Sequence, residues 1–95
     1  WVVTRDEFEW EPQRGIRCFI NGEKRQDSNT RFEIYGAAHV IAELSAGMTL
    51  KAGTIIAMGT PAGVGMGFTP PKYLKSGDVV RCEIDGIGVL ENTVR

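Results

Sequence analysis

A glycine-rich stretch, residues 59–67, most constrains how this chain can fold. It holds four glycines and no charged residue, and it follows a mostly apolar run, residues 54–58. The run is typical of a buried strand, and the glycines permit positive φ and close approach of the backbone to a ligand. Successive free N–H groups in such a loop can bind an anion, and Thr60 adds a hydroxyl. A glycine-rich turn with no ligand is equally compatible with this composition.

The stretch does not match the phosphate-binding motifs of nucleotide-binding proteins. The dinucleotide fingerprint requires a third glycine where Phe68 stands, and Pro70 and Pro71 follow where a helix would have to begin. The Gly-Lys-Ser/Thr sequence of a Walker motif does not occur in the chain. If the stretch binds a carboxylate or phosphate, it does so by a loop that differs from both of these nucleotide-binding motifs.

Length and charge narrow the function classes. The 95 residues, 42% of them hydrophobic, suffice for one small domain, and we expect the chain, which begins at Trp1, to be a fragment of a longer protein. The net charge of −1 does not suggest a nucleic-acid or anionic-membrane surface. No apolar run approaches the length of a membrane helix, and no signal peptide is recognisable. We therefore expect neither nucleic acid nor membrane as a partner.

Both cysteines stand in period-two patterns with aliphatic residues. Cys18 lies between Ile16 and Ile20, and Cys82 alternates with aliphatic neighbours in the same way. Such placement is typical of inert thiols buried in one core, and neither spacing resembles a metal site. A disulfide stays open as an alternative. A reducing, cytoplasmic location is the expectation.

Turn and periodicity signals predict an α+β fold that is mostly β. Asn21-Gly22 and Asp85-Gly86 are each typical of the tight turn of a hairpin. An apolar stripe predicts one helix over residues 37–46, with Gly47 as its C-terminal cap. The strands expected around the two turns are residues 16–20, 23–28, 79–84 and 87–94.

Ionisable residues by themselves give little indication of catalysis. His39, the only histidine, falls within the expected helix, where a surface or core role is commoner than a catalytic one. An acidic run comprises Asp6, Glu7, Glu9 and Glu11, in which the pairs Glu7/Glu9 and Glu9/Glu11 would each place two carboxylates on one face of a strand, as ligands for a hard divalent cation. Aromatic residues interleave with these acids and a proline ends the run, so a solvated edge or loop is the preferred interpretation.

A combination of motifs covers nearly the whole chain. The motifs are Gly-Thr-Pro-Ala-Gly-Val-Gly at 59–65, Pro-Pro-Lys-Tyr-Leu-Lys-Ser-Gly-Asp at 70–78, Ile-Asp-Gly-Ile-Gly-Val-Leu-Glu-Asn at 84–92, Val-Thr-Arg-Asp-Glu at 3–7, Asn-Gly-Glu-Lys-Arg-Gln-Asp-Ser-Asn-Thr at 21–30 and Leu-x-x-Gly at 50–53. Together they closely resemble the C-terminal portion of the catalytic domain of the fumarylacetoacetate hydrolase family. The likeness is greatest to the fumarylacetoacetate hydrolase domain-containing subgroup.

This resemblance implies that residues 1–95 form the C-terminal portion of a single catalytic domain whose upstream half is absent here. The family's domain is a mixed β-roll, usually paired as a homodimer, so the remainder of the same domain would be the chain's first partner. The resemblance also implies a divalent cation, Mg²⁺ with Mn²⁺ or Ca²⁺ as substitutes, and a small 2-oxo or 1,3-dicarbonyl acid as substrate. In a eukaryote, a mitochondrial location is the alternative to a cytoplasmic one.

Few site residues of the family map onto this chain. The Gly-Thr of the family's Gly-Thr-Pro motif holds the substrate carboxylate, which assigns substrate binding to Gly59 and Thr60. The family's metal ligands and catalytic residues precede Trp1, so the resemblance places none of them in this chain. Gln26 and Thr30 also match family positions, so the resemblance implies a supporting role for them.

Three functions follow as hypotheses. The first is a metal-dependent hydrolase or decarboxylase of acylpyruvate, fumarylpyruvate or oxaloacetate-type acids. The second is an isomerase or tautomerase of 2-hydroxymuconate-type acids or oxaloacetate on the same scaffold, in which proton transfer replaces C–C cleavage. The third is a non-catalytic fragment that supplies only packing or dimer surface.

Overall fold

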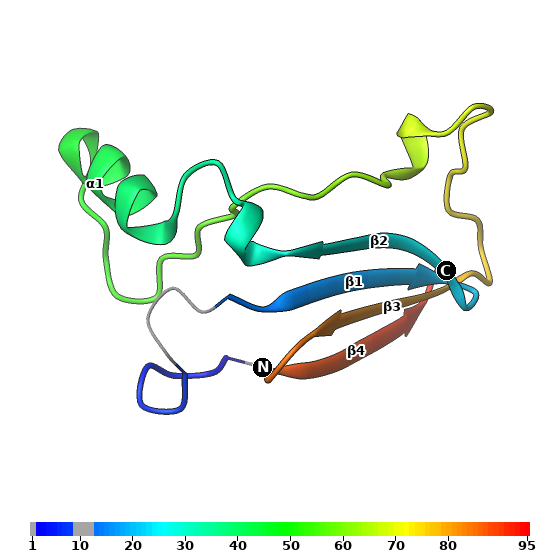
Figure 1. Ribbon diagram of the computed structural model, residues 1–95, viewed down its shortest axis with the longest axis horizontal. Helices are drawn as coiled ribbons and strands as arrows, with labels where there is room; N and C mark the ends of the chain where they lie inside the picture. The colour runs from blue at the N-terminus through cyan, green and yellow to red at the C-terminus, as the bar shows by residue number, and fades with distance from the viewer. Residues whose placement is uncertain (1, 9–12) are drawn as a thin grey trace.

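The computed structural model describes residues 2–8 and 13–95, and its core element is a four-stranded sheet. The strand order is β2-β1-β3-β4, and each neighbouring pair is antiparallel (Figure 1). The fold is therefore α+β and mostly β, as the sequence predicts. The elements in chain order are β1 (Gly15–Ile20), β2 (Glu23–Asn29), the 3₁₀ turn η1 (Thr30–Phe32), α1 (Ala37–Gly47), the 3₁₀ turn η2 (Gly65–Gly67), β3 (Val79–Ile84) and β4 (Gly88–Thr93).

Both expected hairpins are present. Asn21 and Gly22 have φ of 51° and 81°, the positive values that a two-residue turn between right-twisted strands requires. The Asn21 side chain also ties this turn to β3, because its Oδ1 accepts from the N–H of Val79 at 2.8 Å. Gly86 turns β3 into β4 with a φ of 81°. The four strands expected around these two turns are thus confirmed, each to within one residue at either end.

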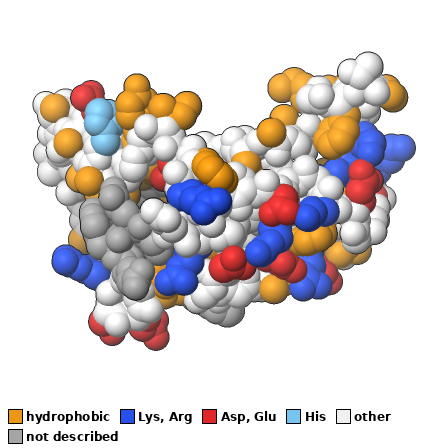
Figure 2. All heavy atoms as spheres, in the orientation of Figure 1, with side chains coloured by type: hydrophobic (Ala, Val, Ile, Leu, Met, Phe, Trp, Pro, Cys, Tyr) orange, Lys and Arg blue, Asp and Glu red, His pale blue; other side chains and the backbone are white. Residues whose placement is uncertain are grey.

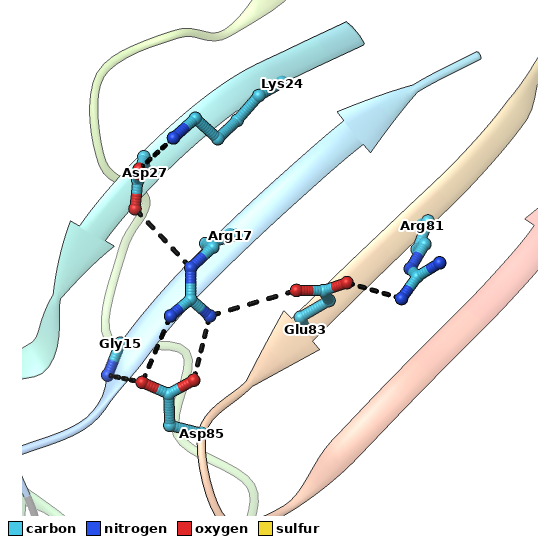
Figure 3. Close-up of polar contacts among 7 residues, drawn as sticks. All are labelled: Gly15, Arg17, Lys24, Asp27, Arg81, Glu83 and Asp85. Carbon is cyan, nitrogen blue, oxygen red and sulfur yellow. Dashed lines mark hydrogen bonds and ion pairs between the residues drawn. The ribbon is translucent and has the colours of Figure 1, made fainter. Parts of the chain in front are cut away.

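One face of the sheet carries a network of charged side chains centred on Arg17 (Figure 3). Its guanidinium binds both carboxylate oxygens of Asp85, at 2.8 and 3.2 Å, and lies 3.8 Å from oxygens of Asp27 and Glu83. The register places these residues beside Arg17 on the flanking strands, because Arg17 is paired with Asp27 on β2 and Glu83 on β3. Figure 2 shows charges of both signs interspersed over the sheet in this view. This face is adapted to water.

The opposite face is apolar, and the two cysteines meet on it. Cys18 and Cys82 are directly paired between β1 and β3, with their sulfurs 4.0 Å apart and both thiols free. Burial and the neighbouring Cys82 thiol raise the pKa of the Cys18 thiol. Cys18 is only half-buried and Cys82 is exposed, so the expectation that both thiols are buried is wrong. The alternation correctly indicated the face, but the part of the chain that the structure describes does not cover all of it.

The strand expected at residues 54–58 does not form. This segment runs extended beside the sheet without joining it, and Ile55 is 93% exposed. An apolar run becomes a strand only where a neighbouring strand offers hydrogen bonds, and none of the described strands does so here. The apolar composition was therefore a correct observation with a wrong structural interpretation.

Helix α1 extends one residue beyond its expected end. Gly47 is its last helical residue, and the cap is Met48, whose N–H donates to the carbonyl of Leu44 at 3.0 Å. The prediction of Gly47 as a cap is therefore wrong. Figure 1 shows α1 beyond one end of the sheet rather than across its face. No helix among the described residues has the length and apolar character that crossing a membrane requires.

The molecule is more open than a compact domain of its length. Its radius of gyration is 15.5 Å, whereas about 12 Å is typical of a compact domain of this size. Among the described residues no hydrophobic side chain is fully buried, and Leu90, on the apolar face of the sheet, is 65% exposed. The apolar face thus has surface available for further packing.

Two glycine-to-alanine substitutions test the first turn and the helix end with opposite signs. Gly22→Ala should lower the free energy of unfolding by about 1–2 kcal/mol, because an L side chain is strained at φ of 81°. Gly47→Ala should raise it by about 0.5–1 kcal/mol, because alanine is a better helix former. A Cβ at either position would have no heavy atom within 4 Å, so packing does not obscure the comparison. Denaturant unfolding of both variants measures the effects, and equal signs would contradict the turn assignment.

The Arg17–Asp85 pair predicts a dependence of stability on pH. The hydrogen bonds from Arg17 lower the pKa of Asp85 below its ordinary value. A carboxylate whose pKa is lowered on folding contributes stability above its unfolded pKa, about 3.9, and loses that contribution as the pH falls through the folded value. Asp85→Asn should therefore be less stable than the parent protein at pH 7, with the difference closing below about pH 4. Glu43→Gln, an exposed site on α1, is the control, and a difference that persists unchanged at pH 2.5 would contradict the assignment.

Candidate functional site

The chain from Met58 to Gly63 lies against β2, and the side chain of Gln26 on β2 forms hydrogen bonds with it. Gln26 Nε2 donates to the carbonyl oxygen of Pro61 at 2.7 Å and to Thr60 Oγ1 at 2.9 Å. Gln26 stands on the same face of the sheet as Cys18, with which it is paired. These hydrogen bonds join β2 to the first residues of the glycine-rich stretch, which lie 34 and 35 positions after Gln26 in the sequence.

Two of the four glycines in this stretch serve packing of chain against chain. A Cβ on Gly63 would overlap the carbonyl of Arg25 on β2, and a Cβ on Gly65 would overlap the carbonyl of Lys72. Gly63 also has a φ of 108°, which L side chains rarely adopt. At these positions the glycines bring backbone against protein backbone and not against a ligand, which accords with the simpler interpretation of the sequence.

Gly59 differs from these two. Its φ is 98°, but a Cβ there would meet no heavy atom within 4 Å, so no other part of the described chain packs against this side of its backbone. Within the described residues, neither the Gly59 nor the Thr60 N–H donates to a backbone carbonyl. Both N–H groups and the Thr60 hydroxyl are therefore available to an outside acceptor.

Charged and aromatic side chains secure the far end of the loop. Arg25 and Lys72 lie over the ring of Phe68, 5.2 and 4.8 Å from its centroid, and both also contact Glu23 on β2. The Lys72 ammonium, 2.7 Å from Glu23 Oε1, is the main cause that lowers the pKa of Glu23. Cation–π contacts at exposed sites contribute about 0.5–1 kcal/mol each, so this cluster adds modestly to the docking of the loop.

A cavity of about 430 Å³ opens between Thr60 and the end of β2. On one side lie Ser28 and its β1 partner Ile16, followed by Thr30 of η1. Phe32 and Tyr35 supply an apolar wall, and Gly59, Thr60 and Pro61 close the other side. None of the lining residues among those described is a lysine, arginine or histidine. The lining also includes the acidic Glu33, so an anion bound beside Thr60 would be held by neutral donors of this chain.

The remaining described candidates from the sequence do not line this cavity. His39 is exposed on α1 and stacks on Tyr35, with ring centroids 4.5 Å apart and planes at 14°. Asp6 accepts a hydrogen bond from Thr4, which is the main cause that lowers its pKa. Glu9 and Glu11 lie outside the described residues. Over residues 2–8 and 13–95, no three His, Cys, Asp or Glu side chains are grouped so as to hold a metal ion. The described residues therefore do not fit a metal site.

The comparison with known families decides the relationship. The family described as fumarylacetoacetate (FAA) hydrolase C-terminal matches residues 1–95. The chain belongs to the fumarylacetoacetate hydrolase family. Its members among the relatives are enzymes named for hydrolase, isomerase or tautomerase activity. The resemblance found in the sequence is thereby confirmed, and so is the fold, a mostly antiparallel sheet with one helix that matches the C-terminal fold of the family.

Three relatives illustrate the range of the family. Oxaloacetate tautomerase YisK of Bacillus subtilis is 51% identical over 85 residues, which cover 88% of this chain and 28% of that protein. The solved fumarylacetoacetate hydrolase of psychrophilic Exiguobacterium antarcticum is 45% identical with a TM-score of 0.92, over 98% of this chain and 33% of that one. Maleylpyruvate hydrolase of Sphingobium sp. SYK-6, solved with manganese(II) and pyruvate, is 35% identical with a TM-score of 0.85, over 98% and 33%. The chain spans about a third or less of the length of these relatives.

Sequence reasoning did not find the cavity itself. It named Gly59 and Thr60 and noted Gln26 and Thr30, but it did not bring Phe32 or Tyr35 into any site. The contacts between Gln26 and the loop depend on tertiary structure, and no local pattern around residue 26 reveals them. The match of Gln26 to a family position was the available signal, and it did not indicate which groups the side chain contacts.

The packing of Gly63 on β2 is open to a direct test. Gly63→Ala should lower the free energy of unfolding by about 2 kcal/mol or more and expose the loop to protease, because its Cβ would overlap the Arg25 carbonyl at a positive φ. Gly67→Ala is the matched control, since its Cβ would meet only Val64 Cγ2, at 3.8 Å, and should change stability by about 0.5 kcal/mol or less. Thermal unfolding and limited proteolysis measure both variants. Equal tolerance of the two would mean that the loop does not rest on β2.

Proposed function

We propose that this chain is the carboxylate-binding part of a fumarylacetoacetate hydrolase-family enzyme that acts on small 2-oxo acids. The observation that carries the proposal is the cavity beside Thr60, where one hydroxyl and two N–H groups of residues 59 and 60 have no carbonyl partner among the described residues. Hydrogen bonds to a charged group contribute about 1.5–3 kcal/mol, so a few such donors can position a carboxylate. The apolar wall of Phe32 and Tyr35 would face the remainder of the substrate.

We propose keto–enol tautomerisation of an oxaloacetate-type acid as the reaction. Its support is the 51% identity to an oxaloacetate tautomerase, the highest among the relatives described above. The hydrolytic or decarboxylating cleavage expected from the sequence is the second candidate, supported by the likeness to a maleylpyruvate hydrolase solved with pyruvate. In either reaction this chain's role is the same. It holds the carboxylate next to the 2-oxo group and so fixes which carbon faces the groups that move the proton or break the bond.

The catalytic groups and the metal ligands are proposed to lie outside this chain. The described residues do not fit a metal site, while a maleylpyruvate hydrolase of the family was solved with manganese(II). We therefore propose a divalent cation, Mg²⁺ or Mn²⁺, held by the remainder of the same domain. The open shape and the partly exposed apolar face of the sheet support such a remainder packing against this chain. A homodimer stays a prediction from the family resemblance. The non-catalytic alternative requires that this cavity bind no substrate.

Thr60 is the residue on which the proposal is tested. Thr60→Val keeps the shape of the side chain and removes its hydroxyl, so kcat/KM for the 2-oxo acid should fall by about one to two orders of magnitude. Thr60→Ser keeps the hydroxyl and is the matched control, with an expected change of about threefold or less. Affinity for Mg²⁺ should stay unchanged in both, because Thr60 is not proposed as a ligand.

The assay uses the protein at its natural length with Mg²⁺ and a panel of oxaloacetate, an acylpyruvate and a 2-hydroxymuconate-type acid. Tautomerisation is followed by the loss of enol absorbance and cleavage by the release of pyruvate. If the protein turns over none of these acids, the proposed function is wrong. If Thr60→Val is fully active while Gly59→Ala is impaired, the carboxylate contact belongs to the backbone N–H groups alone.

A further inference from the structure

We infer that Gln26 is a positioning residue that sets the direction of the Thr60 hydroxyl proton, so that Thr60 presents a donor to the substrate carboxylate. The inference rests on the proposed function, because it concerns the same site. It adds a specific role to a strand residue outside the Gly-Thr-Pro loop. It also explains why a neutral hydroxyl suffices where no cationic side chain of the described residues lines the cavity.

The orientation of the Gln26 amide follows from its two partners. The carbonyl oxygen of Pro61 can only accept a hydrogen bond, so the group 2.7 Å from it must be the amide nitrogen of Gln26. That nitrogen has two protons, and the second is directed to Thr60 Oγ1 at 2.9 Å. Both donors of the amide are thus used on adjacent residues of the loop.

The orientation of the Thr60 hydroxyl follows in turn. Its oxygen accepts from Gln26, and within the described part of the chain this is the one hydrogen bond recorded for it. A hydroxyl that accepts through one lone pair still has its own proton to donate, and that proton must point away from the Gln26 amide. Thr60 lines the cavity, so the proton is available to an acceptor there. A carboxylate is an acceptor only, which makes it the matching ligand group.

A β-bulge in β2 gives Gln26 this position. Cys18 is paired with Gln26, but Phe19 is paired with Lys24, so Arg25 is an extra residue on β2. Bulges redirect neighbouring side chains and leave backbone groups of the extra residue unpaired. Here the carbonyl of Arg25 faces Gly63, and the next side chain, Gln26, reaches Thr60 and Pro61. The bulge therefore contacts the loop twice, once through the Arg25 carbonyl and once through the Gln26 side chain.

A double-mutant cycle tests the inference, with pyruvate as the probe. The variants are Gln26→Leu, Thr60→Val and the double variant, prepared in the natural-length protein saturated with Mg²⁺. Gln26→Leu should raise the Kd for pyruvate by about five- to tenfold when Thr60 is present, and by about twofold or less in the Thr60→Val background. Gln26→Leu also removes the hydrogen bond to Pro61, but it does so in both backgrounds, so the effect of that loss on the Kd cancels in the cycle. Calorimetry gives the Kd values, and kcat and KM for the best acid of the panel provide the second measurement.

Gln26→Glu tests polarity without a change of size. A carboxylate at this position can only accept hydrogen bonds. The Thr60 hydroxyl would therefore donate its hydrogen bond to this carboxylate and present only its lone pairs to the cavity. Pyruvate binding should fall further than in Gln26→Leu, and it should recover in part below about pH 4.5 as the new carboxyl is protonated. This variant also serves if Gln26→Leu does not fold, which thermal unfolding would reveal.

The outcomes separate this inference from the proposed function. If the parent protein binds pyruvate and Thr60→Val weakens binding, but Gln26→Leu has the same effect in both backgrounds, then the inference alone is wrong. If Thr60→Val leaves pyruvate binding unchanged, the hydroxyl is not used and the inference is wrong, although turnover can persist through the backbone donors. If the parent protein neither binds pyruvate nor turns over any 2-oxo acid, the proposed function fails as well.

Discussion

The pair of hydrogen bonds from Gln26 to Thr60 and Pro61 is the contact on which the candidate site depends. Without it, the segment from Met58 to Pro61 would have no polar attachment to the sheet in the described structure. The close packing of Gly63 against the bulge of β2 supports the same arrangement from the other side. A bulge in β2, the Gln26 amide and Gly63 together thus hold an uncharged loop in place as one wall of the cavity.

The sheet that supports this loop has two chemically different faces. The side with Arg17 carries ion pairs between neighbouring strands, which are individually weak because they are exposed to water. The side with Cys18 and Ile16 is apolar and also carries Gln26 and Ser28 at the cavity. Because successive side chains of a strand alternate between faces, the same two hairpins supply a solvent face and a site face. A shift of one residue in register would exchange them.

Membership of the fumarylacetoacetate hydrolase family gives this arrangement its context. The chain matches the C-terminal family region over its whole length, while it spans about a third or less of the relatives described. Its exposed apolar face and open dimensions accord with a unit that packs against further protein. The site offers donors for a carboxylate and an apolar wall, and the described residues do not form a metal-binding cluster.

Local signals in the sequence determined the hairpins, the helix and the family. Asn21-Gly22 and Gly86 specify the two turns because few other residues accept positive φ. Cys18 and Cys82 were assigned correctly to strands by their alternation. Tertiary structure decided what local patterns cannot encode. Among the described residues, 54–58 had the composition of a strand but no partner strand, and Cys82 had the pattern of a core residue but is exposed. Gln26 matched a family position, but its contacts with the loop depend on a segment more than thirty residues away. Backbone conformation depends on a few neighbouring residues, whereas burial, strand pairing and side-chain contacts depend on which distant segments arrive beside them.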